Sequence, residues 1–127
     1  MASSFRNLDD NSFIVFPEDL FEGMSSVTTI RINHYDSLEL LPEKLFSGLT
    51  TLEKISLRDN ALTTLPEGLF EGLSSLTQLK VDHNPITSLP EGIFSGLESL
   101  QKLRLRDLLL TEMPWKIFFS LVNLKEL

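Results

Sequence analysis

The sequence contains no cysteine, which excludes a disulfide framework, a thiolate zinc site and a cysteine nucleophile. No apolar run approaches the roughly 18 residues that a membrane-spanning helix needs. Basic residues are few: the sequence has 11 Lys and Arg and 18 Asp and Glu. The resulting net charge of −7 argues against a globally basic nucleic-acid binder. With 127 residues, 42% of them hydrophobic, the chain is expected to form one ordered domain outside the membrane.

Leucine is abundant, with 26 of the 127 residues, and the leucines recur at a fixed interval. A shift of 24 residues places the segment from Leu52 to Leu73 on the segment from Leu76 to Leu97. Self-similarity at such a period indicates a repeat architecture. We predict a single repeat domain over residues 1–127, with a degraded first copy at 1–26, four copies at 27–51, 52–75, 76–99 and 100–123, and the opening of a further copy at 124–127.

Each copy has two halves with different apolar spacing. The first half contains an alternating pair such as Leu103 and Leu105, which predicts a short strand with every second side chain directed inward. The second half has a Leu-Phe pair and then a leucine three residues after the phenylalanine. This spacing suits a helical or 3-10 turn. One coil cannot bury both sets, so the coils must stack and their strands must form a parallel sheet. The stack predicts an internal column of phenylalanines at Phe21, Phe46, Phe70, Phe94 and Phe118.

These residues resemble the leucine-rich repeat, L-x-x-L-x-L-x-x-N-x-L, in its 24-residue form. The copies are similar to those of Toll-like receptor ectodomains and variable lymphocyte receptors. The resemblance implies an α/β solenoid, a right-handed superhelix with about five parallel strands on a curved concave face and short helical or 3-10 turns on the convex face. It also implies that the concave strand face is the recognition surface, and it supplies no catalytic residues.

The outward strand positions carry most of the basic residues. Seven of the eleven Lys and Arg lie there: Arg31, Lys54, Arg58, Lys80, Lys102, Arg104 and Arg106. Acidic residues gather in the second halves, at Glu18, Asp19, Glu22, Glu43, Glu67, Glu71, Glu91 and Glu98. We therefore predict a protein-binding scaffold that recognises an acidic patch of a protein ligand through a basic concave face, because complementary potentials steer association. One alternative is that these charges only keep the sheet face soluble. Another is an anionic polysaccharide or nucleic acid, which the acidic back would repel.

The position after each strand holds Asn11, Asn60 and Asn84, where a buried amide can satisfy backbone groups of adjacent coils. Tyr35 and Leu108 occupy the same position in the second and fifth copies, so we expect this ladder to be interrupted there.

The residue before that position alternates between acid and imidazole, in the order Asp10, His34, Asp59, His83 and Asp107. A polar ladder at the sheet margin is one interpretation. A zinc site formed by His34, Asp59 and His83 is a second, although a flat column converges poorly on one ion. A pH-sensitive surface, in which the carboxylates favour protonated imidazoles, is a third.

The fifth copy is apolar where its siblings are polar. Trp115 stands at the position of Glu67 and Glu91, Phe119 at that of Glu71, and Leu109 follows Leu108. Exposed apolar patches mark interfaces, so the alternative function is a structural module that forms homo-oligomers through Leu109, Trp115 and Phe119 at its C-terminal end. Otherwise Trp115 and Phe119 fold over the end of the stack as a cap.

No serine, histidine or carboxylate forms an arrangement of nucleophile and base, and the recurrent glycines are typical of turns. We therefore expect no enzymatic activity, no cofactor, no structural metal, and neither a nucleic-acid nor a membrane partner. The N-terminal residues lack the apolar core of a signal peptide, and no N-x-Ser/Thr acceptor is present. The sequence leaves the cellular location open.

Overall fold

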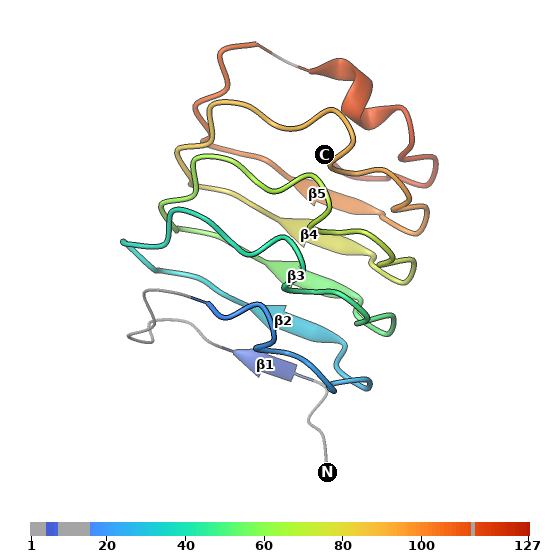
Figure 1. The fold of residues 1–127 in the computed structure, drawn as a ribbon. Coiled ribbons are helices and arrows are strands. Elements are labelled where there is room, and N and C mark those ends of the chain that lie inside the picture. Colours follow the sequence, from blue (N-terminus) through green and yellow to red (C-terminus); the bar gives the residue numbers. More distant parts are fainter. Residues whose placement is uncertain (1–4, 8–15, 113) are drawn as a thin grey trace.

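The computed structural model describes residues 5–7, 16–112 and 114–127. It contains one parallel sheet whose strands follow one another in chain order (Figure 1). The elements are β1 (Phe5–Asn7), β2 (Thr29–Arg31), β3 (Lys54–Ser56), β4 (Gln78–Lys80), β5 (Lys102–Arg104) and the 3-10 helix η1 (Trp115–Phe118). The predicted solenoid with five stacked parallel strands is confirmed. Its helical content is small, since η1 is the only helix in the described part of the chain.

The strands stack with equivalent residues side by side. Ile55 of β3 pairs with Leu79 of β4, and Leu79 pairs with Leu103 of β5. All three side chains are buried, whereas the residues before and after each of them are not. This alternation is the period-two pattern of a strand with one buried face. The register therefore keeps one row of aliphatic side chains inside the stack and the basic rows outside.

The core contains a stack of phenylalanine rings that runs along the solenoid. The ring centroids of Phe21 and Phe46 lie 6.0 Å apart, and those of Phe46 and Phe70, and of Phe70 and Phe94, lie 6.3 Å apart. The interplanar angles are at most 20°, so the rings are stacked. The prediction that Phe118 continues the column is wrong. Phe118 is only partly buried.

The fifth coil keeps the backbone hydrogen bonds of the earlier returns, such as that from the Leu121 amide to the Phe118 carbonyl, but differs at one backbone position. In the earlier coils the return ends in a left-handed glycine, with φ of +81° at Gly72 and +83° at Gly96. The equivalent residue in the fifth coil is Ser120, which is not among the residues with positive φ, and the preceding Phe119 caps η1 with φ of −66°. The Phe118 ring lies 6.3 Å from Trp115 at 58°, in the same short helix. The change of turn therefore accompanies the loss of the phenylalanine stack.

Strand β1 is the element that the leucine pattern did not indicate. It pairs with β2 through Phe5 with Thr29 and Arg6 with Ile30, so Arg6 occupies the position that the other strands fill with a buried aliphatic residue. Arg6 is partly exposed. The first copy also has the apolar residues of the repeat: Phe16 and Phe21 are buried in the core, and Leu20 and Met24 pack against it. Its earlier repeat residues, Leu8, Asn11 and Phe13, lie outside the described residues.

Candidate functional site

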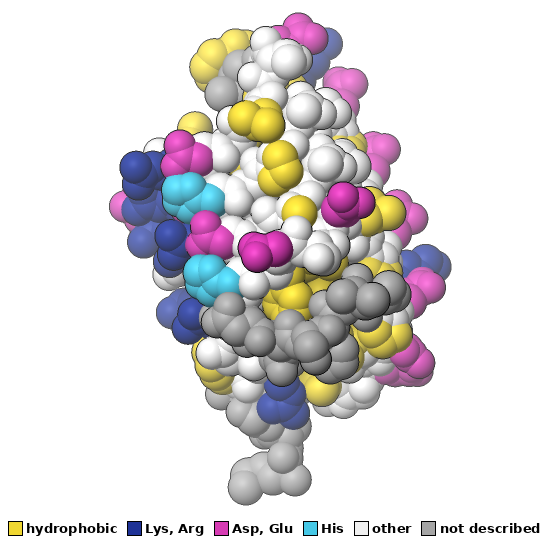
Figure 2. Space-filling model, turned by 90° about the vertical axis from the view of Figure 1, so that its left-hand side faces the viewer, with side chains coloured by type: hydrophobic (Ala, Val, Ile, Leu, Met, Phe, Trp, Pro, Cys, Tyr) yellow, Lys and Arg dark blue, Asp and Glu magenta, His cyan; other side chains and the backbone are white. Residues whose placement is uncertain are grey.

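The outer face of the sheet carries the predicted partner-binding residues. Lys54 and Arg106 are exposed, and the other five, Arg31, Arg58, Lys80, Lys102 and Arg104, are half-buried. Seen from the flank, Lys and Arg gather along one edge of the molecule and many of the Asp and Glu side chains along the opposite edge (Figure 2). We call this surface, formed by residues 29–33, 54–58, 78–82 and 102–106, the strand face.

The strand register arranges this face in rows that cross the strands. The first row is Thr29, Lys54, Gln78 and Lys102, and the second is Arg31, Ser56, Lys80 and Arg104. Cations therefore alternate with uncharged polar side chains over β2, β3 and β4. A hollow of about 390 Å³ opens on this part of the strand face. Its lining is polar and basic and includes Arg31, Lys54, Ser56, Arg58 and Lys80.

Acids of the same chain lie close to Arg58, Lys102 and Arg104. Arg58 Nε lies 3.7 Å from Asp82 Oδ2. Lys102 Nζ lies 3.2 Å from Glu126 Oε2, and Arg104 Nη2 lies 4.0 Å from Glu126 Oε1. Glu126 is placed there because it forms a parallel bridge with Lys102. The basic character of the strand face is therefore reduced toward its C-terminal side, which the count of charges did not reveal.

Two outward positions are buried, contrary to the sequence pattern. Asn33 Oδ1 accepts hydrogen bonds from the Arg58 amide at 2.7 Å and the Ser56 hydroxyl at 3.0 Å. Asp82 Oδ1 accepts the Arg106 amide at 2.9 Å. Both side chains are buried because each bonds the backbone of the next coil. Alternation alone predicts exposure there and cannot detect this bonding.

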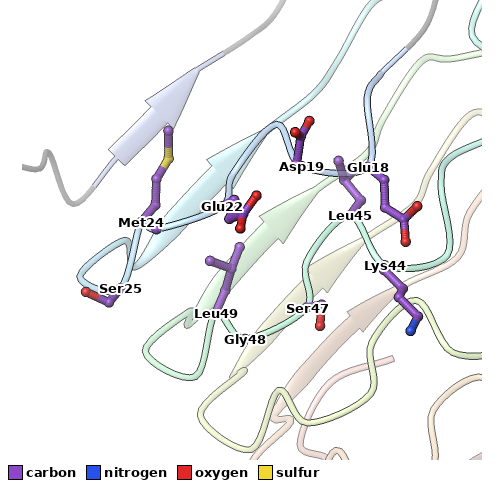
Figure 3. A pocket seen from close by; sticks show the side chains of 11 residues that line it. Glu18, Asp19, Glu22, Met24, Ser25, Lys44, Leu45, Ser47, Gly48 and Leu49 are labelled. Atoms are coloured by element: carbon purple, nitrogen blue, oxygen red, sulfur yellow. The ribbon is translucent and has the colours of Figure 1, made fainter.

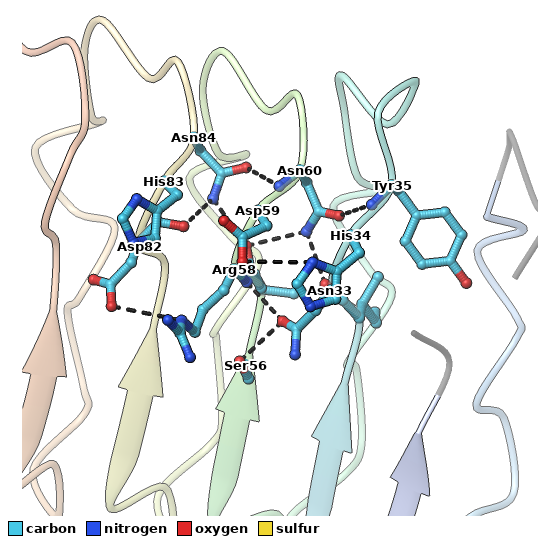
Figure 4. Close-up of polar contacts among 12 residues, drawn as sticks. Asn33, His34, Tyr35, Ser56, Arg58, Asp59, Asn60, Asp82, His83 and Asn84 are labelled. Atoms are coloured by element: carbon cyan, nitrogen blue, oxygen red, sulfur yellow. Dashed lines mark hydrogen bonds and ion pairs between the residues drawn. The ribbon is translucent and has the colours of Figure 1, made fainter. Parts of the chain in front are cut away.

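The predicted asparagine ladder is present beyond the C-terminal ends of the strands (Figure 4). Asn60 accepts the Tyr35 amide at 2.9 Å and donates to the Ile32 and Leu57 carbonyls at 2.7 and 3.1 Å. Asn84 repeats the arrangement one coil later. It accepts the Asn60 and Leu62 amides and donates to the Leu57 and Val81 carbonyls. These bonds tie each coil to the previous one.

The ladder ends where Tyr35 and Leu108 replace asparagine, as expected. The Tyr35 ring is buried and packs edge-on against Phe16, with centroids 5.3 Å apart. Leu108 is partly buried against the core, and its side chain has no amide group to form these hydrogen bonds. Asn11 lies outside the described residues.

The alternating column of acids and histidines has a conformational cause. His34, Asp59, His83 and Asp107 all have positive φ, between 57° and 68°. Among residues with side chains, Asn, Asp and His are enriched in this left-handed region. The side chains form two separate pairs, His34 Nδ1 with Asp59 Oδ2 at 3.5 Å and His83 Nδ1 with Asp107 Oδ2 at 2.9 Å. Asp10 is not among the described residues.

The proposed zinc set of His34, Asp59 and His83 is not assembled. Over residues 5–7, 16–112 and 114–127, no three His, Asp or Glu side chains come together in a way that could hold a metal ion. The paired residues are partly exposed and lie on the flank of the sheet (Figure 2). The polar-ladder interpretation fits this geometry.

The apolar residues of the fifth copy are exposed rather than folded over the end as a cap. The exposed fractions are 65% for Trp115, 76% for Phe119 and 59% for Leu109. Trp115 and Phe119 border the same hollow of about 630 Å³, together with Leu110 and Ile117. Leu109 does not line that hollow, so the structure brings together two of the three residues predicted for self-association.

A further hollow, of about 730 Å³, lies on the opposite side from the strand face (Figure 3). Residues of the first and second coils form it, among them Glu18, Asp19, Glu22 and Lys44. It contains none of the residues predicted for partner binding. Its acidic lining agrees with the predicted accumulation of acids in the second halves of the copies.

Comparison with known proteins identifies the repeat. The leucine rich repeat family matches residues 34–86 and 75–127. A comparison with curated protein sequences gives no significant match. None of the helices in the described residues is long and apolar enough to cross a bilayer.

Solved structures resemble the chain over most of its length. A chain in the structure of the Drosophila Toll–Spatzle complex is 31% identical, with a TM-score of 0.79. The match covers 95% of this chain and 19% of that one. The TLR13–ssRNA13 complex gives 28% identity and a TM-score of 0.87, with 95% of this chain covering 17% of that one. The leucine-rich repeat domain of APL1B is 22% identical with a TM-score of 0.81, over 87% of this chain and 33% of that domain, and shows the shared fold.

Proposed function

Because this chain belongs to the leucine-rich repeat family, whose domains are generally recognition modules without catalytic activity, we propose that it is a protein-binding scaffold. The recognition surface is the concave strand face, and the partner presents an acidic patch. One observation carries this proposal: seven of the eleven Lys and Arg side chains lie on the strand face, while the opposite side bears acidic residues. Such a separation of charge steers an acidic partner to one face and fixes its orientation.

The similar structures include two kinds of complex. The Toll structure is a complex with Spatzle, and the TLR13 structure is a complex with single-stranded RNA. This chain spans less than a fifth of either relative, so neither partner transfers directly. A protein partner is favoured because the net charge of −7 and the acidic back repel a long polyanion that extends beyond the strand face.

The test compares two double charge reversals with the same change in net charge. Arg58→Glu with Arg104→Glu alters the strand face. Lys44→Glu with Lys116→Glu alters cations that lie off that face. Each variant and the wild type are used to capture partners from the native source, and captured proteins and RNA are identified separately.

We expect the strand-face variant to lose a protein that the wild type and the Lys44/Lys116 variant both retain. Equal capture by all three would reject the strand face as the recognition surface. Loss of a captured RNA, with no protein affected, would replace the protein partner by a nucleic acid.

Self-association through the apolar C-terminal end is a second candidate. The observation that favours it is the high exposure of Trp115 and Phe119 around one hollow. Sedimentation measured over a range of concentrations would show a mass that rises for the wild type and stays monomeric for Trp115→Glu. Leu40→Glu is the matched control, because Leu40 is 62% exposed and lies outside that hollow. A monomer at every concentration for the wild type would reject this candidate.

A further inference from the structure

Ser56 lies at the centre of four cations on the strand face. Arg31 of β2 and Lys80 of β4 are its direct neighbours across the sheet. Lys54 and Arg58 precede and follow it by two residues, on the same side of the chain. Neighbouring strands are about 4.8 Å apart, and residues two apart in a strand are separated by about 6.6 Å. Four long basic side chains therefore surround one short side chain.

The shortness of Ser56 explains the hollow of about 390 Å³ at this point. All four cations line the hollow together with Ser56. The Ser56 hydroxyl already donates its proton to Asn33 Oδ1 at 3.0 Å. A ligand in the hollow would therefore meet the ammonium groups of Lys54 and Lys80 beside the polar side chains of Thr29 and Gln78, while Ser56 leaves room for it.

Asp82 restrains one of these cations. Its side chain is 9% exposed, and its Oδ1 is fixed by the Arg106 amide at 2.9 Å. Its Oδ2 lies 3.7 Å from Arg58 Nε (Figure 4). The guanidinium is thus attracted at its Nε side, although Nε is buried and forms no hydrogen bond. Its two terminal nitrogens are the groups that can form the paired hydrogen bonds that arginine makes with a carboxylate.

The remaining cations of the strand face are placed differently. Lys102 and Arg104 both lie within 4.0 Å of Glu126, which offsets their charge. Within the described part of the chain, Lys54 and Lys80 form no ion pair with an acid. The ammonium groups of Lys54 and Lys80 therefore attract an anion to the part of the strand face around Ser56.

We infer that the hollow around Ser56 is a subsite for the carboxylates of an acidic segment in a partner protein. This inference rests on the proposed function and narrows it to one part of the strand face. The site is compact, and Asp82 and Glu126 interrupt the positive charge toward β5. Its lining contains no aromatic side chain on which bases could stack. A carboxylate segment fits these features better than a nucleic-acid strand.

The probe is a fluorescein-labelled peptide of six glutamates, with a six-glutamine peptide as the uncharged reference, and fluorescence anisotropy measures its binding. Lys54→Gln with Lys80→Gln removes two cations from the hollow. Lys102→Gln with Arg104→Gln removes the same charge from the part paired with Glu126. Ser56→Leu fills the hollow and changes no charge. Circular dichroism melting verifies that each variant folds.

We expect Lys54→Gln with Lys80→Gln, and Ser56→Leu, each to weaken binding about tenfold, because both abolish the enclosed contact. The variant at Lys102 and Arg104 should lose less than about threefold, since those side chains already have an acidic partner.

Equal losses for the two double variants would reject the subsite and leave the basic strand face in place. If the wild-type protein does not bind the glutamate peptide, but charge reversal on the strand face abolishes capture of the native partner, the subsite alone would be rejected. Binding unchanged in both double variants, with native capture insensitive to charge reversal, would remove the proposed function as well. Tighter binding of single-stranded RNA or inorganic phosphate, with the same dependence on the variants, would assign the hollow to phosphate groups instead.

Discussion

The central coils, residues 52–99, and the fifth coil, residues 100–123, follow the same 24-residue plan with different stabilising features. In the central coils Asn60 and Asn84 bond the preceding coil, and Phe70 and Phe94 stack. The fifth coil has Leu108 and Phe118 at these positions, and neither makes the corresponding contact. It nevertheless keeps β5 in register, with Leu103 fully buried.

The difference separates two roles of the sequence pattern. The aliphatic residues are sufficient to place a coil on the stack, because they bury its inner face against the previous coil. The asparagines, phenylalanines and glycines determine how closely the rest of the coil follows its neighbour. Where they are absent, in the fifth coil, the phenylalanine position is only partly buried, at Phe118.

The largest effect is expected for Phe70→Ala. Phe70 is stacked between Phe46 and Phe94 and is fully buried, so its removal should lower the free energy of unfolding by about 3 to 5 kcal/mol. Phe118→Ala is the matched change in the fifth coil and should cost less than half as much, because Phe118 is partly exposed. Urea unfolding of both variants measures the difference. Similar losses would mean that the two coils are equally well packed.

Asn84→Ala should have the next largest effect. Asn84 accepts two backbone amides and donates to backbone carbonyls, all in a buried position, so unsatisfied groups remain after its removal. We expect a loss of roughly 1 to 3 kcal/mol in the free energy of unfolding.

The reverse substitution sharpens this comparison. Leu108→Asn introduces the missing amide in the fifth coil and should raise the free energy of unfolding by about 1 kcal/mol if the ladder extends. A decrease would show that Leu108 contributes more by packing than an asparagine would by hydrogen bonding.

The smallest effect is expected at one of two kinds of glycine in the central coils. Gly72 has φ of +81° with open space where a Cβ would stand, so Gly72→Ala should cost about 1 to 2 kcal/mol through the backbone alone. At Gly92 an added Cβ would lie 2.7 Å from Glu67 Oε1, the movable end of an exposed side chain. Gly92→Ala should stay within about 0.5 kcal/mol of the wild type, as Glu67 moves aside. Thermal unfolding of the pair measures this, and an equal loss would contradict the backbone explanation.

Much of the fold could be predicted from periodic residues. The alternating pairs of the Leu-x-Leu type predicted strands β2 to β5 and which of their sides is buried. The regular repeat interval within the chain predicted the stacked rings from Phe21 to Phe94. Asn60 and Asn84 were identified because a buried amide beside a strand end needs backbone partners. These features depend on burial, which a hydrophobic period reports directly.

The features that were missed depend on contacts with the next coil or on backbone angles. The period does not encode the left-handed conformation of His34 and Asp59, nor the burial of Asp82 by the Arg106 amide. Strand β1 has Arg6 in place of an aliphatic residue, so no pattern indicated it. At the site, the seven basic residues were placed correctly on the outer face, but the pairing of Lys102 with Glu126 follows only from the register of the last strand segment.

Backbone hydrogen bonds between coils run along the axis of the stack, from Thr77 to Glu53, from Gln101 to Thr77 and from Lys125 to Gln101. A coil in the interior therefore shares two interfaces, whereas a coil at either end shares one. Damage to an interior coil weakens both interfaces and divides the array, while damage at an end only shortens it. Amide exchange should accordingly be slow near β3 and β4, each of which has a strand on both sides, which keeps the hollow around Ser56 on a persistent part of the sheet.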